Sequence, residues 1–445
     1  MASDLLSIGL SGARAARIGL DVTAHNIANA GTAGYVRRSI SLSEVSASGI
    51  MGRGEDVSLS GVRLASINRN ADMFRQAEVR RTGADAARAK TEVSGLENIN
   101  AAIEQSRVFP SMVEFEGALQ RLASDPTDPS LRSGVIEAAR TLAGTFNIAA
   151  NGLEGVADGL HFEAGAAVAD VNTLAGELAR VNLRLSRASD ASSDQSTLLD
   201  QRDTLLEKIS KLGTIATSFA ADGQVEVRLG GNSGPLLVQG GTASPLTMAT
   251  DGDGLITFAV NATPVTLAGG SLAGQALSLA KLDEVRDRLN TIADSVMGTV
   301  NAAQANGAAL DGSGGVPMFT GSGAAGFTLA FTDGAKIATA PAGSPAGSRD
   351  PGNLDALRSA LATADPSGEL DGLIFDISST VSSRRITQGA LDTIAGNARI
   401  ALESQAGVNL DEEAANLVRF QQAFQASSKA MQVAGTIFDT LMGLK

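Results

Sequence analysis

Few residues of this chain have the types and spacing that enzyme chemistry requires. It contains two histidines, His25 and His161, and no cysteine, which excludes thiolate nucleophiles, disulfides and cysteine-based metal sites. A lone histidine is more often a satisfied structural residue than a metal ligand. Glu412 and Glu413 are neighbours, so on a helix their carboxylates point apart and form no catalytic pair. We therefore predict no catalytic residue, no metal site and no enzymatic activity.

Three short motifs look like functional sites but are better explained as ordinary structural elements. GSGAAG at 321–326 matches the dinucleotide loop G-x-G-x-x-G, but that loop precedes a helix, whereas the next residues, FTLAFT, predict a strand. DGDG at 251–254 lacks the later ligands of a calcium loop and indicates a turn. LLDQRD at 198–203 is typical of a solvated helix face or an ion-pair network. We predict no bound cofactor.

Composition narrows the class of protein. A chain of 445 residues is too long for one core, so several domains are expected. Acidic residues exceed basic ones by 48 to 35, and the net charge of −13 disfavours nucleic acid and anionic membranes as partners. The start, MASDLLSIGL, lacks the basic and apolar regions of a cleaved signal, and the chain has no apolar run of about 18 residues.

Residues 408–444 predict one long helix, around which the chain is organised. Asn409 can cap it and Glu412 lies three residues on, as in a capping box. One heptad position is filled by Leu410, Leu417, Phe424, Met431 and Phe438. A second row, three residues later, holds Phe420, Ala434 and Leu441 but is interrupted by Glu413 and Ser427. This pattern indicates a coiled-coil seam with gaps, which needs a partner.

The N-terminal helix, predicted at 3–30, offers that partner. Its heptad row is Leu6, Ala13, Leu20 and Ile27, with Leu10, Ala16 and Ala24 close to the same face. Large side chains pack densely against small ones, so we infer that the two ends of the chain pair. Gly9, Gly12 and Gly19 each cost about 1 kcal/mol in a helix, so this helix should fray alone. Alternatively, both stripes are ordinary core faces of a helical bundle.

The middle of the chain predicts helices and one β region. Proline is absent from the first 109 residues, from the last 79 and between Pro129 and Pro235, which permits long helices there. Helical spacing covers 72–105, 131–150, 168–185, 198–212, 282–296 and the chain from 372. Residues 36–65 predict an extended or hairpin-like excursion, 214–270 a small β insertion, and 307–353 mostly loop.

We therefore predict a mainly α fold with a small inserted β domain, whose long helices form a discontinuous coiled-coil and helical-bundle core. The predicted domains are 1–65 with 405–445, a terminal coiled-coil domain; 66–213 with 271–404, a helical bundle; and 214–270, the β domain.

Both ends of the chain resemble a known family. LDVTAHNIANAGTAGYVRR at 20–38 resembles the N-terminal signature of bacterial flagellar rod, hook and hook-associated proteins, and GVNLDEEAANLVRFQQAFQASSKAMQ at 407–432 is similar to their C-terminal signature. With LLDQRDTLLEKISKL at 198–212 and NAAQANGAALDGSGG at 301–315, the chain most resembles the hook-associated protein 1 family. It departs from the family at His25, usually Asn, at Ala33, usually Pro, and at Phe424, often Tyr.

The resemblance implies a structural subunit that forms a ring between hook and filament and allows the filament to assemble. Implied partners are further copies of the chain, hook protein, hook-associated protein 3 and an export chaperone near the C-terminus. The implied location is extracellular, in the flagellum, after type III export without a cleaved signal. We expect the assembly interface to comprise Leu6, Leu10, Ala13, Leu20, Ile27, Leu410, Leu417, Phe420, Phe424, Met431, Phe438 and Leu441, with Asn26, Asn29 and Gly34 shaping the turn.

Alternatives remain within and outside this family. A hook or distal-rod protein would carry more β structure and would lack the long helices at 168–212. Some larger hook-associated proteins and flagellins carry enzymatic inserts, but the β region here has neither paired acids nor a histidine cluster. A helical scaffold unrelated to flagella is the third alternative.

Overall fold

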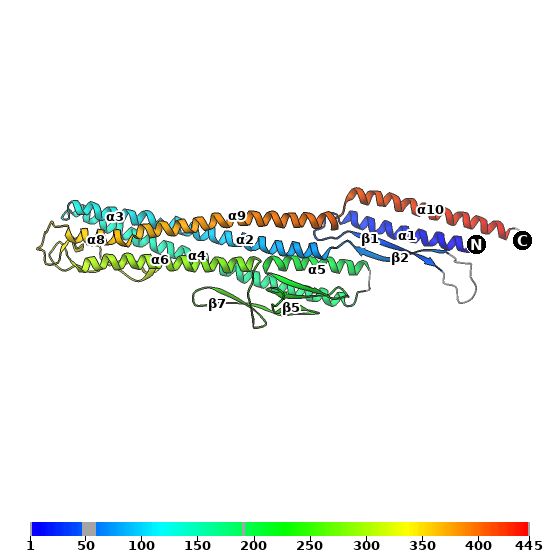
Figure 1. Cartoon of the computed structure of the whole chain (residues 1–445), viewed down its shortest axis with the longest axis horizontal. Coiled ribbons are helices and arrows are strands. Elements are labelled where there is room, and N and C mark those ends of the chain that lie inside the picture. The colour runs from blue at the N-terminus through cyan, green and yellow to red at the C-terminus, as the bar shows by residue number, and fades with distance from the viewer. Residues whose placement is uncertain (1, 47–58, 189–191, 444–445) are drawn as a thin grey trace. The chain divides into compact units, whose positions relative to one another are not determined.

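The computed structural model describes residues 2–46, 59–188 and 192–443, and long helices dominate it, as predicted (Figure 1). The chain divides into two compact units built from separate segments. Unit 1 comprises Met1–Ala84, Val171–Pro245 and Asp392–Lys445, and unit 2 comprises Asp85–Asp170 and Leu246–Leu391. Three helices contribute residues to both units: α2 (Met73–Ser106), α4 (Pro129–Leu185) and α9 (Pro366–Ala406). The division into three domains stays a prediction.

Unit 1 contains both ends of the chain. α1 (Ala2–Ala28) packs along α10 (Leu410–Met442), so the two termini lie at the same end of this helix pair (Figure 1). The expected pairing of the ends is therefore present. Asn409 caps α10, with its side chain accepting hydrogen bonds from the backbone N–H groups of Asp411 and Glu412. The Glu412 carboxylate, predicted to complete a capping box, lies 3.3 Å from Arg37 Nη1.

The excursion after α1 is a hairpin. β1 (Arg38–Ser46) pairs antiparallel with β2 (Leu59–Arg69), and both strands contact α1. Two register shifts interrupt the ladder. Part of the predicted excursion, residues 47–58, lies outside the described residues.

The β region at 214–270 forms two sheets. In unit 1, β3 (Ile215–Phe219), β4 (Val225–Leu229), β5 (Leu236–Gln239) and β6 (Thr242–Ala243) make an antiparallel sheet in that order. In unit 2, β7 (Leu246–Thr250), β8 (Ile256–Val260) and β9 (Thr263–Val265) make another. DGDG is the turn between β7 and β8, where the Asp251 carboxylate accepts hydrogen bonds from the N–H groups of Asp253 and Leu255.

Unit 2 is a helical bundle with a conventional apolar core. It contains α3 (Val108–Ser124), α6 (Ser271–Ala305) and α8 (Gly352–Ala364) together with its parts of α2, α4 and α9. Four fully buried rings form a chain of contacts: the centroids of Phe115 and Phe319 are 5.9 Å apart, those of Phe319 and Phe327 4.6 Å, and those of Phe327 and Phe146 5.1 Å. Aromatic contacts at these distances stabilise a core beyond simple burial.

Residues 307–353 are mostly irregular, as predicted. Their short elements are β10 (Gly307–Ala308), β11 (Phe319–Thr320), α7 (Gly323–Gly326), β12 (Thr328–Leu329), the 3-10 turn η1 (Gly334–Lys336) and β13 (Ala340–Pro341). Buried Arg132 on α4 fastens this segment, since its guanidinium donates to the carbonyls of Gly334 and Ile337 at 3.0 and 2.9 Å. The strand predicted for FTLAFT is reduced to two residues.

The helices expected at 131–150 and 168–185 are one continuous helix, the 57-residue α4. No proline interrupts it after its first residue, and glycine only weakens a helix interior. Between them, α4 and α5 (Ser193–Leu212) cover the stretch expected to distinguish this chain from hook and rod proteins. Within the described ranges, no helix is long and apolar enough to cross a membrane.

Candidate assembly interface

The seam between α1 and α10 is built on glycines. An added Cβ on Gly19 would lie 2.6 Å from Cδ1 of Phe420, and one on Gly9 would lie 2.7 Å from Cγ of Met431. Real Cβ atoms essentially never approach other atoms so closely, so a larger residue at either position would force the facing side chain to shift. The glycines that weaken α1 as an isolated helix are therefore the sites at which α10 approaches it most closely.

The seam follows the predicted rows only in part: the second row of α10 lies in it, whereas the first row, apart from Met431 against Gly9, does not, which is a correction. On α10 the interrupted second row faces α1: Glu413 and Ala434 are each 2% exposed, and Phe420 and Ser427 are half-buried. On α1 the buried residues include Gly9, Ala13, Ala16, Gly19, Thr23 and Asn26. Heptad counting favoured the rows with the largest apolar side chains, whereas close approach of the two backbones requires the smallest.

The large residues expected in the seam lie mostly outside it. Of the predicted set, Ala13 is buried, and Leu20, Leu417, Phe420 and Met431 are half-buried. The exposed members are Leu6, Leu10, Ile27, Leu410, Phe424 and Phe438, with Leu410 and Phe438 more than half exposed. Leu441 belongs to α10, but its side chain lies outside what the structure describes. We call the six exposed residues, three on α1 and three on α10, the outer row.

One end of the seam is closed by a buried polar contact. The side chain of Asn26, 1% exposed, donates to the carbonyl of Arg38 at 2.8 Å and to Glu413 Oε2 at 3.1 Å. Its Oδ1 accepts from the Arg38 N–H at 3.0 Å and from the Tyr35 hydroxyl at 2.8 Å. Arg37 Nε lies 2.7 Å from Glu413 Oε1. All the hydrogen-bonding capacity of this amide is used, so it fixes α1, the following turn and α10 together.

The turn after α1 rests on the other two expected residues. Asn29 Nδ2 donates to the carbonyl of His25 at 2.9 Å, and its Oδ1 accepts from the Thr32 hydroxyl at 3.3 Å. Gly34 has φ +81°, and a Cβ there would lie 2.4 Å from Thr204 Oγ1 of α5. Glycine is required at Gly34 both for the left-handed backbone and for this close approach.

The LLDQRD cluster is a buried ion-pair network and not a solvated face. Asp200 lies 3.3 Å from Arg38 Nη2 and 2.8 Å from Arg69 Nε. Asp203 lies 2.7 Å from both Arg69 Nη2 and Arg202 Nη2. The network joins α5 to both strands of the β1–β2 hairpin, so the hairpin is held by charge as well as by its own ladder.

The surroundings of Asp200 and Asp203 shift the pKa values of the two carboxylates in opposite directions. Burial raises the pKa of Asp200 above its ordinary value, although Arg69 and Arg38 act in the opposite direction. Burial acts the same way on Asp203, but there Arg202 and Arg69 together outweigh it and hold the pKa of Asp203 below its ordinary value. Such shifts occur in structural ion-pair networks as well as in active sites.

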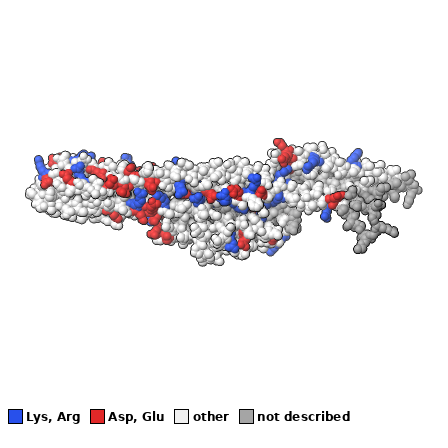
Figure 2. Space-filling model, viewed as in Figure 1, with Lys and Arg blue, Asp and Glu red and all other residues white. Residues whose placement is uncertain are grey.

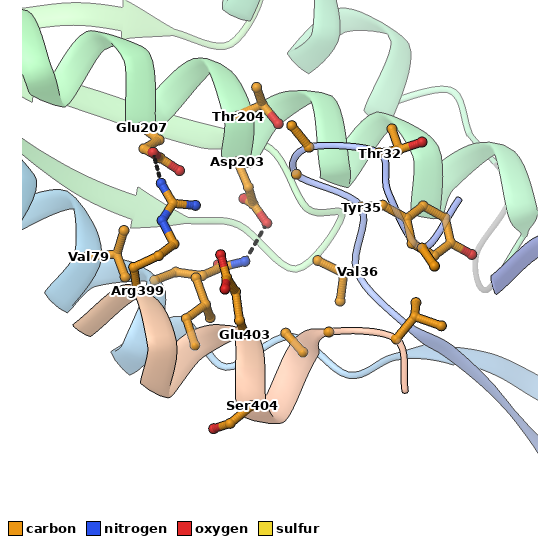
Figure 3. Close-up of a pocket in the computed structure, with 18 of the residues that line it drawn as sticks. Thr32, Tyr35, Val36, Val79, Asp203, Thr204, Glu207, Arg399, Glu403 and Ser404 are labelled. Atoms are coloured by element: carbon orange, nitrogen blue, oxygen red, sulfur yellow. Dashed lines mark hydrogen bonds and ion pairs between the residues drawn. The ribbon is translucent and has the colours of Figure 1, made fainter. Parts of the chain in front are cut away.

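A pocket of about 730 Å³ lies beside this network (Figure 3). Its walls include the turn at 30–36, the end of α9 and the connection from α9 to α10. Arg399 pairs with Glu207, and Gln76 Nε2 donates to Asp203 at 2.9 Å. The charged side chains that line the pocket are thus largely engaged with other residues of its lining. Among the described residues, no cluster of histidines or acids could hold a metal ion.

Comparison with known proteins gives the family. A sequence model described as the flagellar hook-associated protein FlgK helical domain matches residues 93–319, half of the chain. The chain belongs to the FlgK family of flagellar hook-associated proteins. Residues 6–35 match the flagella basal body rod protein family, and residues 402–444 match the C-terminal family of the flagellar basal body rod FlgEFG proteins. The two ends are thus of a kind shared with rod proteins, whereas the FlgK helical domain lies between them.

The relatives carry matching descriptions. Flagellar hook-associated protein 1 of Salmonella typhimurium is 27% identical over 334 residues, which cover 72% of this chain and 59% of that protein. The chain thus spans less than two thirds of this relative. The Bacillus subtilis protein of the same name is 24% identical over 98% of this chain and 97% of its own length. The flagellar hook junction protein FlgK from Burkholderia pseudomallei has a similar fold, with a TM-score of 0.66 at 15% identity over 74% of this chain and all of that one.

FlgK-family membership indicates a location in the bacterial flagellum. Reasoning from the sequence found the pairing helices and the turn, and it gave an ion-pair network as one of two interpretations of residues 198–203, but it missed the roles of Glu413 and Arg37. The available signal was an acid in the row that faces a partner helix, with Arg37 and Arg38 directly after the predicted turn.

Proposed function

We propose that the chain is a structural subunit of the junction between hook and filament, where copies form a ring on which the filament assembles. The observation that carries this proposal is the outer row on a FlgK-family chain. Large apolar side chains that face solvent in a row along paired helices mark a surface for protein contacts. The occupant we propose is a second copy, because both ends match families of axial rod proteins.

The predicted interface residues divide into two roles under this proposal. Buried Ala13 and half-buried Phe420 join α1 to α10 within a subunit. The exposed members join neighbouring subunits, with half-buried Leu20, Leu417 and Met431 between the two sets. The proposed partners are the chain itself, hook protein, hook-associated protein 3 and an export chaperone near the C-terminus.

The weakness of the terminal pair supports export of the chain in an unfolded form. α1 carries three glycines in its seam and depends on α10 for stability, so the pair can order on incorporation after the chain has travelled unfolded. We propose export without a cleaved signal, a structural role without enzymatic activity, and the division into three domains described above.

Deletion of the gene tests the junction role. Hooks without filaments, with flagellin shed into the medium, are the expected result in electron microscopy and in an assay of the medium. Absent hooks would move the chain to the rod or hook, a candidate that the matches of its two ends to rod families favour. Normal flagella would contradict any such role.

A single substitution tests the outer row. Phe424→Asp should abolish filament assembly while the circular dichroism of the purified chain stays unchanged, because the side chain is exposed in the free subunit. The matched control is Phe162→Asp, which changes an exposed phenylalanine of α4 in unit 2. Filaments built by the Phe424 variant would refute the assignment of this surface.

A further inference from the structure

A second surface of unit 1 is strongly basic in an otherwise acidic chain. A groove of about 710 Å³ is lined by α4, α5 and the turn after α1. Arg180 and Arg184 project into it from α4 and Lys208 from α5, against one exposed acid, Glu177. The whole chain carries a net charge of −13, so this cluster of positive side chains is opposite in sign to the chain as a whole.

The three exposed cations of this groove form no ion pair with the described residues of their own subunit. Among the residues that the structure describes, Arg180, Arg184 and Lys208 have no ion-pair partner. Exposed cations elsewhere are commonly paired, as in Arg140 with Glu137 at 2.8 Å. At the base of the groove, the guanidinium of Arg38 binds Ser193, Thr197 and Asp200, yet its buried Nε has no acceptor. The groove therefore presents three exposed positive charges and one buried donor without an acceptor, which together favour an anionic partner.

The chain itself carries a suitable acidic segment. The first turn of α10 contains Asp411 and Glu412, both exposed, and Figure 2 shows acidic atoms gathered over the start of α10. Asp411 has no ion-pair partner among the described residues. The turn residues 32–35 line both the groove and the pocket that is bounded by the connection leading into α10. The basic and acidic surfaces are thus neighbours on one subunit but distinct from each other.

We propose that the basic groove of one copy binds the acidic first turn of α10 of the next copy. Two different complementary surfaces on each subunit make a head-to-tail contact, and such contacts form a ring when the rotation from one copy to the next closes. This inference rests on the proposed function, which supplies the ring. It adds the charged contact that sets the order of copies around it, whereas the outer row supplies the apolar area.

Cross-linking tests the contact directly, because the native chain has no cysteine. Cells would produce two chains together, one with Arg184→Cys and one with Asp411→Cys, and intact flagella would be treated with a short bismaleimide. A covalent dimer is expected from the mixture and from neither chain alone. The matched control replaces Arg184→Cys by Arg121→Cys, an exposed arginine of α3 in unit 2.

The outcomes separate the two proposals. Filaments that grow normally on both singly substituted chains, with no dimer in the mixture, would overturn the groove contact and leave the junction role intact. A gene deletion without effect on filaments would overturn the junction role itself. Equal dimer yield from the Arg121 control would show nonspecific proximity and also overturn the groove contact.

Charge reversal gives a second, independent readout. Arg180→Glu, Arg184→Glu and Lys208→Glu together should reduce the number of filaments per cell by about tenfold, because three positive charges that attract the acidic turn become negative and repel it. Adding Asp411→Lys to the same chain should restore part of that loss. The control reverses Lys90, Arg121 and Arg140, three exposed cations of unit 2, for the same change in net charge. An equal loss in the control, or no restoration by Asp411→Lys, would contradict the proposal.

Discussion

Unit 2 and the terminal helix pair place their large side chains in opposite ways. In unit 2 the rings of Phe115, Phe146, Phe319 and Phe327 are fully buried and contact one another. In the terminal pair Phe424 and Phe438 are exposed, and the seam is made by glycines, small residues and a buried carboxylate. Unit 2 thus has a core of mutually packed rings, although Phe162 and Phe375 are exposed there, whereas the terminal pair places Phe420 in its seam and leaves Phe424 and Phe438 exposed.

The difference has a physical consequence for when each region becomes stable. Burial of apolar surface contributes about 25 cal/mol per Å², so a core that buries its rings is stable in a free chain. A helix pair that leaves its apolar row exposed gains that contribution only when another surface covers the row. Unit 2 is therefore expected to be folded in the isolated chain, and the terminal pair to gain most of its stability in the assembly.

The largest effect should come from matched phenylalanine truncations. Phe327→Ala should lower the free energy of unfolding by about 3–5 kcal/mol, because it leaves a cavity among packed rings. Phe424→Ala, at a ring that is 40% exposed, should lower it by only about 1 kcal/mol. Urea denaturation of the two purified variants, followed by circular dichroism, measures both. Equal losses in the two variants would mean that the outer row is buried in the free chain.

Removing the buried carboxylate of the seam should be nearly as costly. Glu413→Ala should destabilise the terminal pair by about 3 kcal/mol, because it removes the acceptor of Arg37 Nε and one of the two acceptors of the buried Asn26 amide. Hydrogen exchange of the α10 amides should then speed up, while exchange in unit 2 stays unchanged. Glu412→Ala removes a neighbouring exposed acid and is the control, with an expected effect below about 1 kcal/mol.

Glu413 also shows where the sequence was sufficient and where it was not. The N-cap at Asn409 and the β region could be predicted because each depends on local residue types, and the pairing of the ends because both terminal helices carry a heptad stripe. The facing rows could not, because whether Glu413 interrupts a row or anchors it depends on Asn26, 387 residues earlier in the chain. The heptad pattern likewise treats Gly19 as a weak helix residue and gives no sign that a ring rests on it.

The glycine seam gives an intermediate effect of predictable sign. Gly19→Ala adds a methyl group 2.6 Å from the Phe420 ring and should destabilise the pair by about 1–3 kcal/mol, although alanine favours a helix. Gly435→Ala, in α10, meets no atom within 4 Å and should stabilise the pair by about 0.4–1 kcal/mol. Thermal unfolding of the two variants, followed by the helical signal in circular dichroism, compares their stabilities. A stabilising Gly19→Ala would show that α1 and α10 lie further apart in solution.

The smallest effect should be seen at Tyr35, the only tyrosine in a chain without tryptophan. Burial raises the pKa of its phenol above the ordinary value of 10.0, with Glu413 adding to the rise and Arg38 opposing it. The neutral phenol donates to Asn26 Oδ1 at 2.8 Å, a bond that contributes about 1 kcal/mol. This contribution is fully present below pH 10.0 and is lost as the pH rises through the folded-state pKa.

The absorbance of the phenolate reports this ionisation without background from unit 2. Its midpoint should lie above the ordinary value in the folded chain and return to it in denaturant. Glu413→Gln should lower the midpoint, because it removes a negative charge that opposes ionisation, whereas Phe327→Ala, a change in unit 2, should leave it unchanged where the chain is folded. A folded-state midpoint at the ordinary value would mean that the turn and the start of α10 are open to water in the free chain. In that case the terminal pair would depend on the assembly for its polar contact as well as for its outer row.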